Sequence, residues 1–142
     1  MKIITSSSLE FLKKYLNNSS PTGYEIEGQK IWIEYLKNYV HSFITDSYGT
    51  AVGVINPDAK FKLVIEAHSD EISWYVNYIT DNGLIYVIRN GGSDHQIAPS
   101  KDVNIHTKKG IVKGVFGWPA IHTRKPIKEE SPKIDNIFID VG

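Results

Sequence analysis

The 142-residue sequence contains no cysteine, no excess of charge of either sign and no long uninterrupted hydrophobic run. Without cysteine there is no disulfide scaffold, no thiolate zinc site and no cysteine nucleophile, so a protein-bound metal must be held by His, Asp or Glu. The same absence fits a reducing, cytoplasmic location. The longest hydrophobic run, residues 84–88, is too short to cross a membrane, and serines follow the first residues instead of an apolar signal core. We therefore expect neither a membrane span nor a secretory signal.

Charge is balanced along the whole chain, with 16 Lys and Arg residues against 16 Asp and Glu residues. Binding to nucleic acid or to anionic lipid depends on clustered positive charge that neutralises phosphates. The sequence has no such basic cluster, so we expect no nucleic-acid or membrane partner.

The first 40 residues have the periodicity of two helices. Ser7 and Glu10 are predicted to form the capping box of the first helix, and Thr22 and Glu25 the capping pair of the second. Apolar positions of the second helix recur at three- and four-residue steps and predict one buried stripe. These positions are Ile31, Trp32, Tyr35, Leu36, Tyr39 and Val40.

After His41 the pattern changes to β-strands. Short β-rich runs separated by turn residues are predicted to be strands at 42–46, 51–56 and 61–68. Two hairpins are predicted beyond residue 70, and residues 136–142 are again strand-like, whereas the charged segment 124–132 is predicted to be a loop. The change near Asp70 indicates a boundary between an α/β portion, residues 1–70, and an all-β portion, residues 71–142.

The most specific local motif is His68-Ser69-Asp70, which follows the apolar residues Leu63, Val64 and Ile65. Residues two apart in an extended chain face the same way, so the imidazole and the carboxylate are expected to lie together. A carboxylate that accepts one ring N–H of a metal-bound histidine fixes its tautomer and orientation. The motif therefore indicates His68 as a metal ligand and Asp70 as its orienting partner.

A structural interpretation of the same motif stays open. A histidine at the end of a strand is commonly a hydrogen-bonding group, and zinc needs three or four protein ligands unless a carboxylate bridges two ions. The sequence offers no second convincing ligand cluster. The motif alone does not choose between the two interpretations.

The wider sequence resembles the tetrahedral, glutamyl-aminopeptidase-type metallopeptidases, metallopeptidase family forty-two, whose members are often labelled endoglucanases. The resemblance extends over nearly the whole chain. The stretches that carry it are SPTGYE (20–25), DSYGT (46–50), AHSDEI (67–72), NGL (82–84), GG (91–92), KKGIVKGVFG (108–117), IH (121–122) and FIDVG (138–142).

This resemblance implies a cytosolic exopeptidase that uses two divalent ions, zinc or cobalt, to remove amino-terminal residues from peptides. His68 would bind one ion, and Asp70, the catalytic carboxylate of this segment, would orient the His68 imidazole. The implied fold is α/β: residues 1–70 would form the first part of an α/β/α zinc-peptidase catalytic domain. Residues 71–142 would belong to an all-β, barrel-like insert domain, incomplete here, through which homo-oligomers form.

The sequence departs from the family pattern in several respects. The resemblance places the general base and the remaining metal ligands beyond residue 142, so the 142 residues alone are expected to be inactive. Ser69 and Ser73 stand where a methionine and a glycine are usual. His122 matches a histidine after a proline-bearing turn, and both a substrate-binding role and a surface or interface role stay open for it.

Two other functions stay open at this point. Because most of the implied ligands are missing, the chain as it stands is also compatible with a non-catalytic assembly or interaction module. A related two-metal deacylase or carboxypeptidase also uses a His-x-Asp pair at a strand end.

Overall fold

The computed structural model describes residues 4–124 and 131–142. The chain forms two compact units, Met1–Glu71 and Ile72–Gly142, which we call the N-terminal and the C-terminal unit. Residues 125–130, within the segment predicted to be a charged loop, lie outside the described residues. In the part of the chain that the structure describes, no helix is both long and apolar enough to cross a membrane.

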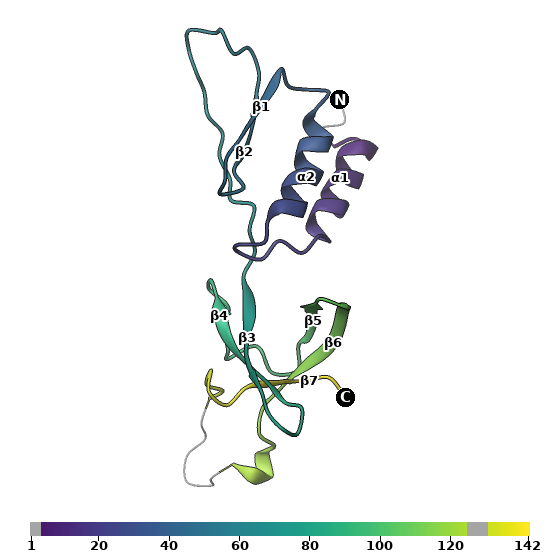
Figure 1. The fold of residues 1–142 in the computed structure, drawn as a ribbon, viewed down its shortest axis with the longest axis vertical. Coiled ribbons are helices and arrows are strands. Elements are labelled where there is room, and N and C mark those ends of the chain that lie inside the picture. Colours follow the sequence, from purple (N-terminus) through teal and green to yellow (C-terminus); the bar gives the residue numbers. More distant parts are fainter. Residues whose placement is uncertain (1–3, 125–130) are drawn as a thin grey trace. The chain divides into compact units, whose positions relative to one another are not determined.

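Two helices in the N-terminal unit, α1 (Ser6–Leu16) and α2 (Ile26–Leu36), lie side by side (Figure 1). The rings of Phe11 and Tyr35 stack between them, with centroids 4.1 Å apart. The helices predicted from periodicity are therefore confirmed, although α2 ends at Leu36, before the predicted stripe does.

Both predicted helix caps are wrong. The capping box of α1 consists of Thr5 and Ser8: the Ser8 N–H donates to Thr5 Oγ1 at 3.1 Å, and the Thr5 N–H donates to Ser8 Oγ at 2.9 Å. The side chains of Thr5 and Ser8 therefore form the capping box, and those of Ser7 and Glu10 do not. Glu25 precedes α2 without a capping hydrogen bond from its side chain, and the Thr22 hydroxyl has a different partner, described below.

A hairpin of β1 (Ser42–Thr45) and β2 (Ala51–Val54) follows the helices, as predicted. α2 contacts β2, where Gly53 allows close approach: a Cβ at this position would lie 3.0 Å from Val40 Cγ1 and 3.5 Å from the Trp32 ring. The predicted apolar stripe is therefore only half-buried against the hairpin, and Tyr39 is exposed.

The strand predicted at residues 61–68 is wrong, since this segment is assigned neither helix nor strand. A strand exists only where its N–H and C=O groups pair with a neighbouring chain. Within the described residues no ladder forms along this segment, and Leu63, Val64 and Ile65 are 76%, 77% and 91% exposed. The segment has the apolar composition of a strand, but no described residue pairs with it along residues 61–68.

The C-terminal unit is a five-stranded antiparallel sheet with the order β3-β4-β7-β6-β5 (Figure 1). Its strands are β3 (Ser73–Ile79), β4 (Ile85–Asn90), β5 (Asp102–Thr107), β6 (Gly110–Gly117) and β7 (Phe138–Asp140). Both predicted hairpins and the predicted terminal strand are confirmed. The short strand β7 lies between the two hairpins and pairs with β4 and β6, which joins them into one sheet.

The hydrophobic core of the C-terminal unit lies against this sheet. Ile137, which precedes β7, is completely buried, and Ile139 within β7 is 4% exposed. The other buried core residues come from β4, β6 and the segment between β4 and β5: Ile85, Val87, Ala98 and Phe116. The last strand therefore supplies both sheet hydrogen bonds and core side chains.

Candidate functional site

The His-x-Asp motif lies where two segments of the N-terminal unit meet. Pro21 and Glu71 form an isolated parallel bridge, in which the Glu71 N–H donates to Ser20 O at 2.9 Å and the Thr22 N–H donates to Glu71 O at 3.3 Å. The Glu71 carboxylate also accepts the Ser20 N–H at 2.8 Å, and Ser20 is only 6% exposed. The backbone that carries Asp70 is thus attached to the loop between α1 and α2.

His68 and Asp70 are in direct contact, as predicted from their spacing. His68 Nδ1 lies 2.9 Å from Asp70 Oδ1 and 3.0 Å from the Asp70 backbone oxygen. An ionised carboxylate and a carbonyl can only accept, so Nδ1 must carry the proton. In the neutral imidazole this leaves the lone pair on Nε2, on a side chain that is 86% exposed.

The Asp70 carboxylate is anchored through both of its oxygens. The Thr22 hydroxyl donates to Oδ2 at 2.6 Å, while Oδ1 faces the imidazole. The hydrogen bond from Thr22 and, next, the one from His68 hold the pKa of the Asp70 carboxyl below its ordinary value. Asp70 is therefore the anionic partner that a metal-binding histidine requires at neutral pH.

Local chain geometry explains how the loop reaches Asp70. The Tyr24 N–H donates to Pro21 O at 2.7 Å, and Gly23 adopts a φ of 87°, which favours glycine. The Gly23 N–H donates to Glu25 Oε1 at 2.7 Å. This tight turn follows Thr22 and leads the chain into α2, which begins at Ile26. The Thr22 hydroxyl, just before the turn, contacts Asp70.

The arrangement fits a histidine metal ligand at His68, because the proton on Nδ1 leaves Nε2 able to coordinate an ion. Among the described residues, however, no group of three or more His, Asp or Glu side chains is placed to hold a metal ion. The described residues thus provide one oriented histidine and its carboxylate partner, not a full coordination sphere.

His122 lies in the C-terminal unit, whereas His68 and Asp70 belong to the N-terminal one. It is exposed within the short 3₁₀ helix η1 (Ile121–Thr123), which follows the proline-bearing turn. Beside it, the Arg124 guanidinium lies 3.3 Å from the centre of the Trp118 ring and donates from Nε to Pro119 O at 2.8 Å. These contacts fix the turn that presents His122, and its role in substrate binding stays a prediction.

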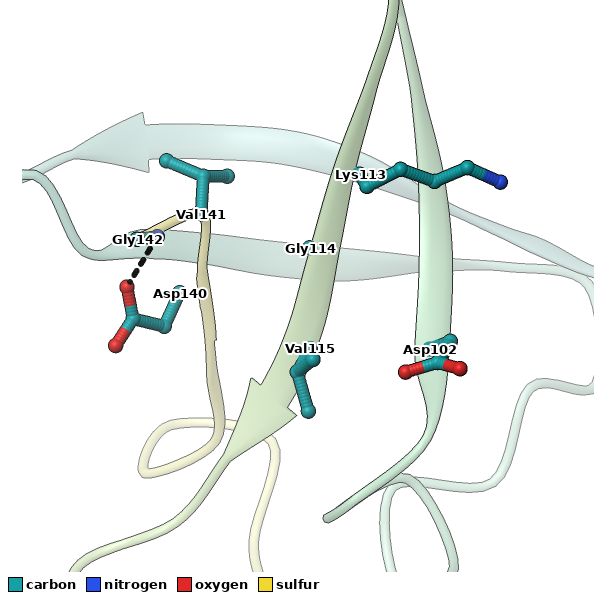
Figure 2. Close-up of a pocket in the computed structure, with 7 residues that line it drawn as sticks. All are labelled: Asp102, Lys113, Gly114, Val115, Asp140, Val141 and Gly142. Carbon is teal, nitrogen blue, oxygen red and sulfur yellow. Dashed lines mark hydrogen bonds between the residues drawn. The ribbon is translucent and has the colours of Figure 1, made fainter.

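A hollow of about 590 Å³ lies on the sheet of the C-terminal unit (Figure 2). Asp102 on β5 and Lys113 on β6 line it together with Asp140, whose carboxylate accepts the Gly142 N–H at 3.0 Å. The Lys113 ammonium donates to Asn104 Oδ1 at 2.6 Å, a cross-strand bond within the hairpin. No histidine is among the described residues that line the hollow.

Thr22 is the site residue that the sequence did not reveal. Its position three residues before Glu25 indicated a helix cap, whereas its hydroxyl contacts a residue 48 positions away in the chain. No local pattern carries such a contact. The one available signal was that Thr22 lies in the stretch SPTGYE, which contributes to the family resemblance.

Comparison with known proteins places this chain among peptidases. The sequence model of the M42 glutamyl aminopeptidase family matches residues 49–142. A lysyl aminopeptidase from Pyrococcus furiosus is 29% identical over 136 residues, covering 94% of this chain and 39% of that protein.

Solved structures give the same relationship. A TET aminopeptidase from a marine-sediment Thaumarchaeota archaeon superposes with a TM-score of 0.89 at 24% identity, covering 94% of this chain and 38% of that one. The TET1 peptidase of Pyrococcus horikoshii, which can assemble into a tetrahedron or a large octahedral shell, gives a TM-score of 0.73 at 28% identity. That comparison covers 94% of this chain and 40% of the other. The chain thus spans less than half the length of each of these proteins.

Proposed function

The chain belongs to the M42 glutamyl aminopeptidase family, and on that premise we propose that it is part of a metal-dependent aminopeptidase. In this proposal His68 is a metal ligand, Asp70 orients it, and the substrates are peptides from which amino-terminal residues are removed. The proposal that the complete enzyme is longer than these 142 residues is supported by the comparison in which the chain covers 39% of its lysyl aminopeptidase relative.

The observation that carries the proposal is the contact between His68 Nδ1 and Asp70 Oδ1 at 2.9 Å. Because this contact and the Asp70 backbone oxygen hold the proton on Nδ1, the exposed Nε2 is left to coordinate. With Nδ1 bonded to Asp70 and the side chain 86% exposed, His68 presents Nε2 to an incoming ligand.

His68 would hold one of two divalent ions, zinc or cobalt, and a bound ion of this kind lowers the pKa of its water and polarises the scissile carbonyl. The residues of this chain contribute orientation. Asp70 keeps the imidazole in the coordinating tautomer and supplies negative charge beside it, which favours binding of a cation. The general base and the remaining ligands belong to the rest of the enzyme, so the 142 residues alone are proposed to be inactive.

The apolar segment before the motif supports placing the N-terminal unit in a larger α/β/α catalytic domain. Leu63, Val64 and Ile65 are consecutive and exposed, so both faces of this extended segment are apolar. Strands that are hydrophobic on both faces are typical of parallel sheets covered by helices on both sides. We propose that residues 1–70 belong to such a catalytic domain and that residues 71–142 belong to the all-β insert domain.

The test uses the complete protein that contains this chain, assayed on aminoacyl-nitroanilides with and without a chelator. We expect activity that the chelator abolishes and that zinc or cobalt restores. His68→Ala should lower activity at least about 100-fold, and Asp70→Ala about 10- to 100-fold through weaker metal binding. His106→Ala, an exposed histidine on β5, is the matched control and should leave activity unchanged. Activity that resists the chelator, or that survives His68→Ala, would contradict the proposal.

A second candidate function is assembly through the C-terminal unit, and the exposed apolar residues of β3 favour it. Tyr75, Val76, Tyr78 and Ile79 are between 48% and 61% exposed on one edge strand. Exposed apolar groups gathered on one element commonly mark an interface between proteins. We propose that this unit forms homo-oligomers, with His122 at the interface or against the substrate. Size-exclusion chromatography with light scattering tests it, since a strict monomer at high concentration would contradict the proposal.

A further inference from the structure

We propose that Thr22 is a positioning residue for the His68 imidazole and acts through Asp70. The proposal rests on the function proposed above, in which His68 is a metal ligand. The structure brings three side chains into a row, hydroxyl to carboxylate to imidazole, although the first and the second lie 48 residues apart in the sequence.

The geometry of the Asp70 carboxylate carries this inference. The terminal torsion of an aspartate is broad and roughly two-fold, so a carboxylate held by one oxygen can still turn. Here the imidazole faces Oδ1 at 2.9 Å and the Thr22 hydroxyl donates to Oδ2 at 2.6 Å. With each oxygen held by a different side chain, the carboxylate plane is fixed and presents one defined acceptor to Nδ1. Removal of the hydroxyl frees the carboxylate to turn toward water.

The hydroxyl is itself held on a rigid backbone. Thr22 donates its N–H to Glu71 O, directly beyond Asp70, and the preceding residue forms the bridge with Glu71. Behind this bridge, Gly28 of α2 lies so close to Ser20 that a Cβ at residue 28 would sit 2.4 Å from Ser20 Oγ. The turn is therefore braced against α2, and the position of the hydroxyl follows from the fold and not from chance contact of two mobile side chains.

A role as helix cap does not explain this placement. The residue that precedes α2 is Glu25, three positions later, and the Thr22 hydroxyl donates to Asp70 Oδ2. A hydrogen bond from a neutral donor to an ionised carboxylate is among the stronger side-chain bonds. Placing it on the second oxygen of a histidine-orienting aspartate couples the loop between α1 and α2 to the ring nitrogen that would bind metal.

The test measures the tautomer of His68 in the metal-free 142-residue chain by ¹⁵N–¹H NMR at pH 8.5, where an ordinary imidazole is neutral. The His68→Gln variant assigns the signals. We expect the wild type to show mainly the Nδ1–H form. Thr22→Val, which keeps the side-chain shape and removes the hydroxyl, should lower the ratio of Nδ1–H to Nε2–H by about threefold. Asp70→Ala gives the ratio when only the backbone oxygen of residue 70 is left to accept from Nδ1, and Thr22→Ser should keep the wild-type ratio.

Thr45→Val, at an exposed threonine of β1, is the matched control and should leave the ratio unchanged. If Thr22→Val does not fold, Thr22→Ser and Thr22→Ala make the same comparison, because both lose the methyl group and they differ only in the hydroxyl. A wild-type tautomer ratio in the folded variant without the hydroxyl would overturn the proposal. This readout needs neither metal nor turnover, so its failure is distinct from failure of the aminopeptidase assay.

Discussion

The N-terminal and C-terminal units differ sharply in what they bury. All six buried hydrophobic residues of the described chain belong to the C-terminal unit, from Ile85 to Ile139. In the described part of the N-terminal unit, the buried residues are Ser20 and Gly28. Since apolar burial is the main force that offsets conformational entropy, the C-terminal unit carries its own stabilisation, whereas the N-terminal unit is held largely by local hydrogen bonds and half-buried aromatics.

The two units therefore depend on different interactions for their stability. The N-terminal unit holds the residues of the candidate site, yet its apolar segment 61–65 lies exposed. We infer that the C-terminal unit is the more stable of the two, because it holds the buried hydrophobic residues. Four predictions test or refine the contrast.

The largest effect is expected when the units are separated. Residues 72–142 alone should give a dispersed NMR spectrum and one cooperative thermal transition, because this unit contains the cluster of buried hydrophobic residues. Residues 1–71 alone should melt without a cooperative transition. A sharp thermal transition in the isolated N-terminal unit would show that both units are stable on their own and would contradict the difference between them.

Within the C-terminal unit, Ile137→Ala should be severely destabilising. Ile137 is completely buried, and truncating such a side chain leaves a cavity that costs about 2–5 kcal/mol. Urea unfolding followed by the fluorescence of the isolated unit measures the change in the free energy of unfolding. Ile111→Ala on β6, where the side chain is 59% exposed, is the control and should cost less than about 0.5 kcal/mol. Equal changes in the free energy of unfolding for the two substitutions would contradict the assignment of Ile137 to the core.

In the N-terminal unit, Gly28→Ala should destabilise even though alanine is the better helix former. In an open helix the change would stabilise by about 0.5–1 kcal/mol, but here the new Cβ would meet Ser20 Oγ at 2.4 Å. Ser20 is buried and its Oγ accepts from Asn18 Nδ2 at 2.9 Å, so it has little room to yield. The backbone amide NMR signals of Ser20 and Glu71 should shift in the Gly28→Ala variant together with this loss of stability. Gly92→Ala, where a Cβ meets nothing within 4 Å, is the spatial control.

The smallest effect concerns pH and the β1–β2 turn. Asp46 Oδ1 accepts the N–H groups of Thr50 at 3.0 Å and Tyr48 at 2.9 Å, and the backbone bond from Thr50 is the main cause that lowers the Asp46 pKa. The stabilisation is therefore complete above the ordinary aspartate pKa of about 3.9 and is lost as pH falls through the lowered value. A carboxyl NMR titration of Asp46 should show a midpoint below the ordinary aspartate pKa of about 3.9. A midpoint at or above that ordinary value would contradict this.

The sequence predicted those elements whose cause is local. Both hairpins of the C-terminal unit follow from alternating residues and from turns that contain Gly83 and Gly110, whose φ angles are 88° and 121°. The contact of His68 with Asp70 follows equally from two-residue spacing.

What the sequence did not predict depends on distant partners. Residues 61–68 have the composition of a strand but form no ladder within the described residues, and β7 was recognised as a strand without its place between β4 and β6. Thr22 was assigned to a helix cap for the same reason, since its contact with Asp70 is visible only in three dimensions. The pairing of strands that lie dozens of residues apart does not produce a periodic pattern in the sequence.

The position of β7 also sets an order of events during synthesis. Each hairpin, β3–β4 and β5–β6, needs only neighbouring residues and can form within microseconds of leaving the ribosome. The two hairpins are joined through Ile139, which pairs with Ile85 of one and Phe116 of the other. Until residues 137–140 have left the ribosome, the two hairpins have no strand that joins them, and β7 then unites them in a single sheet.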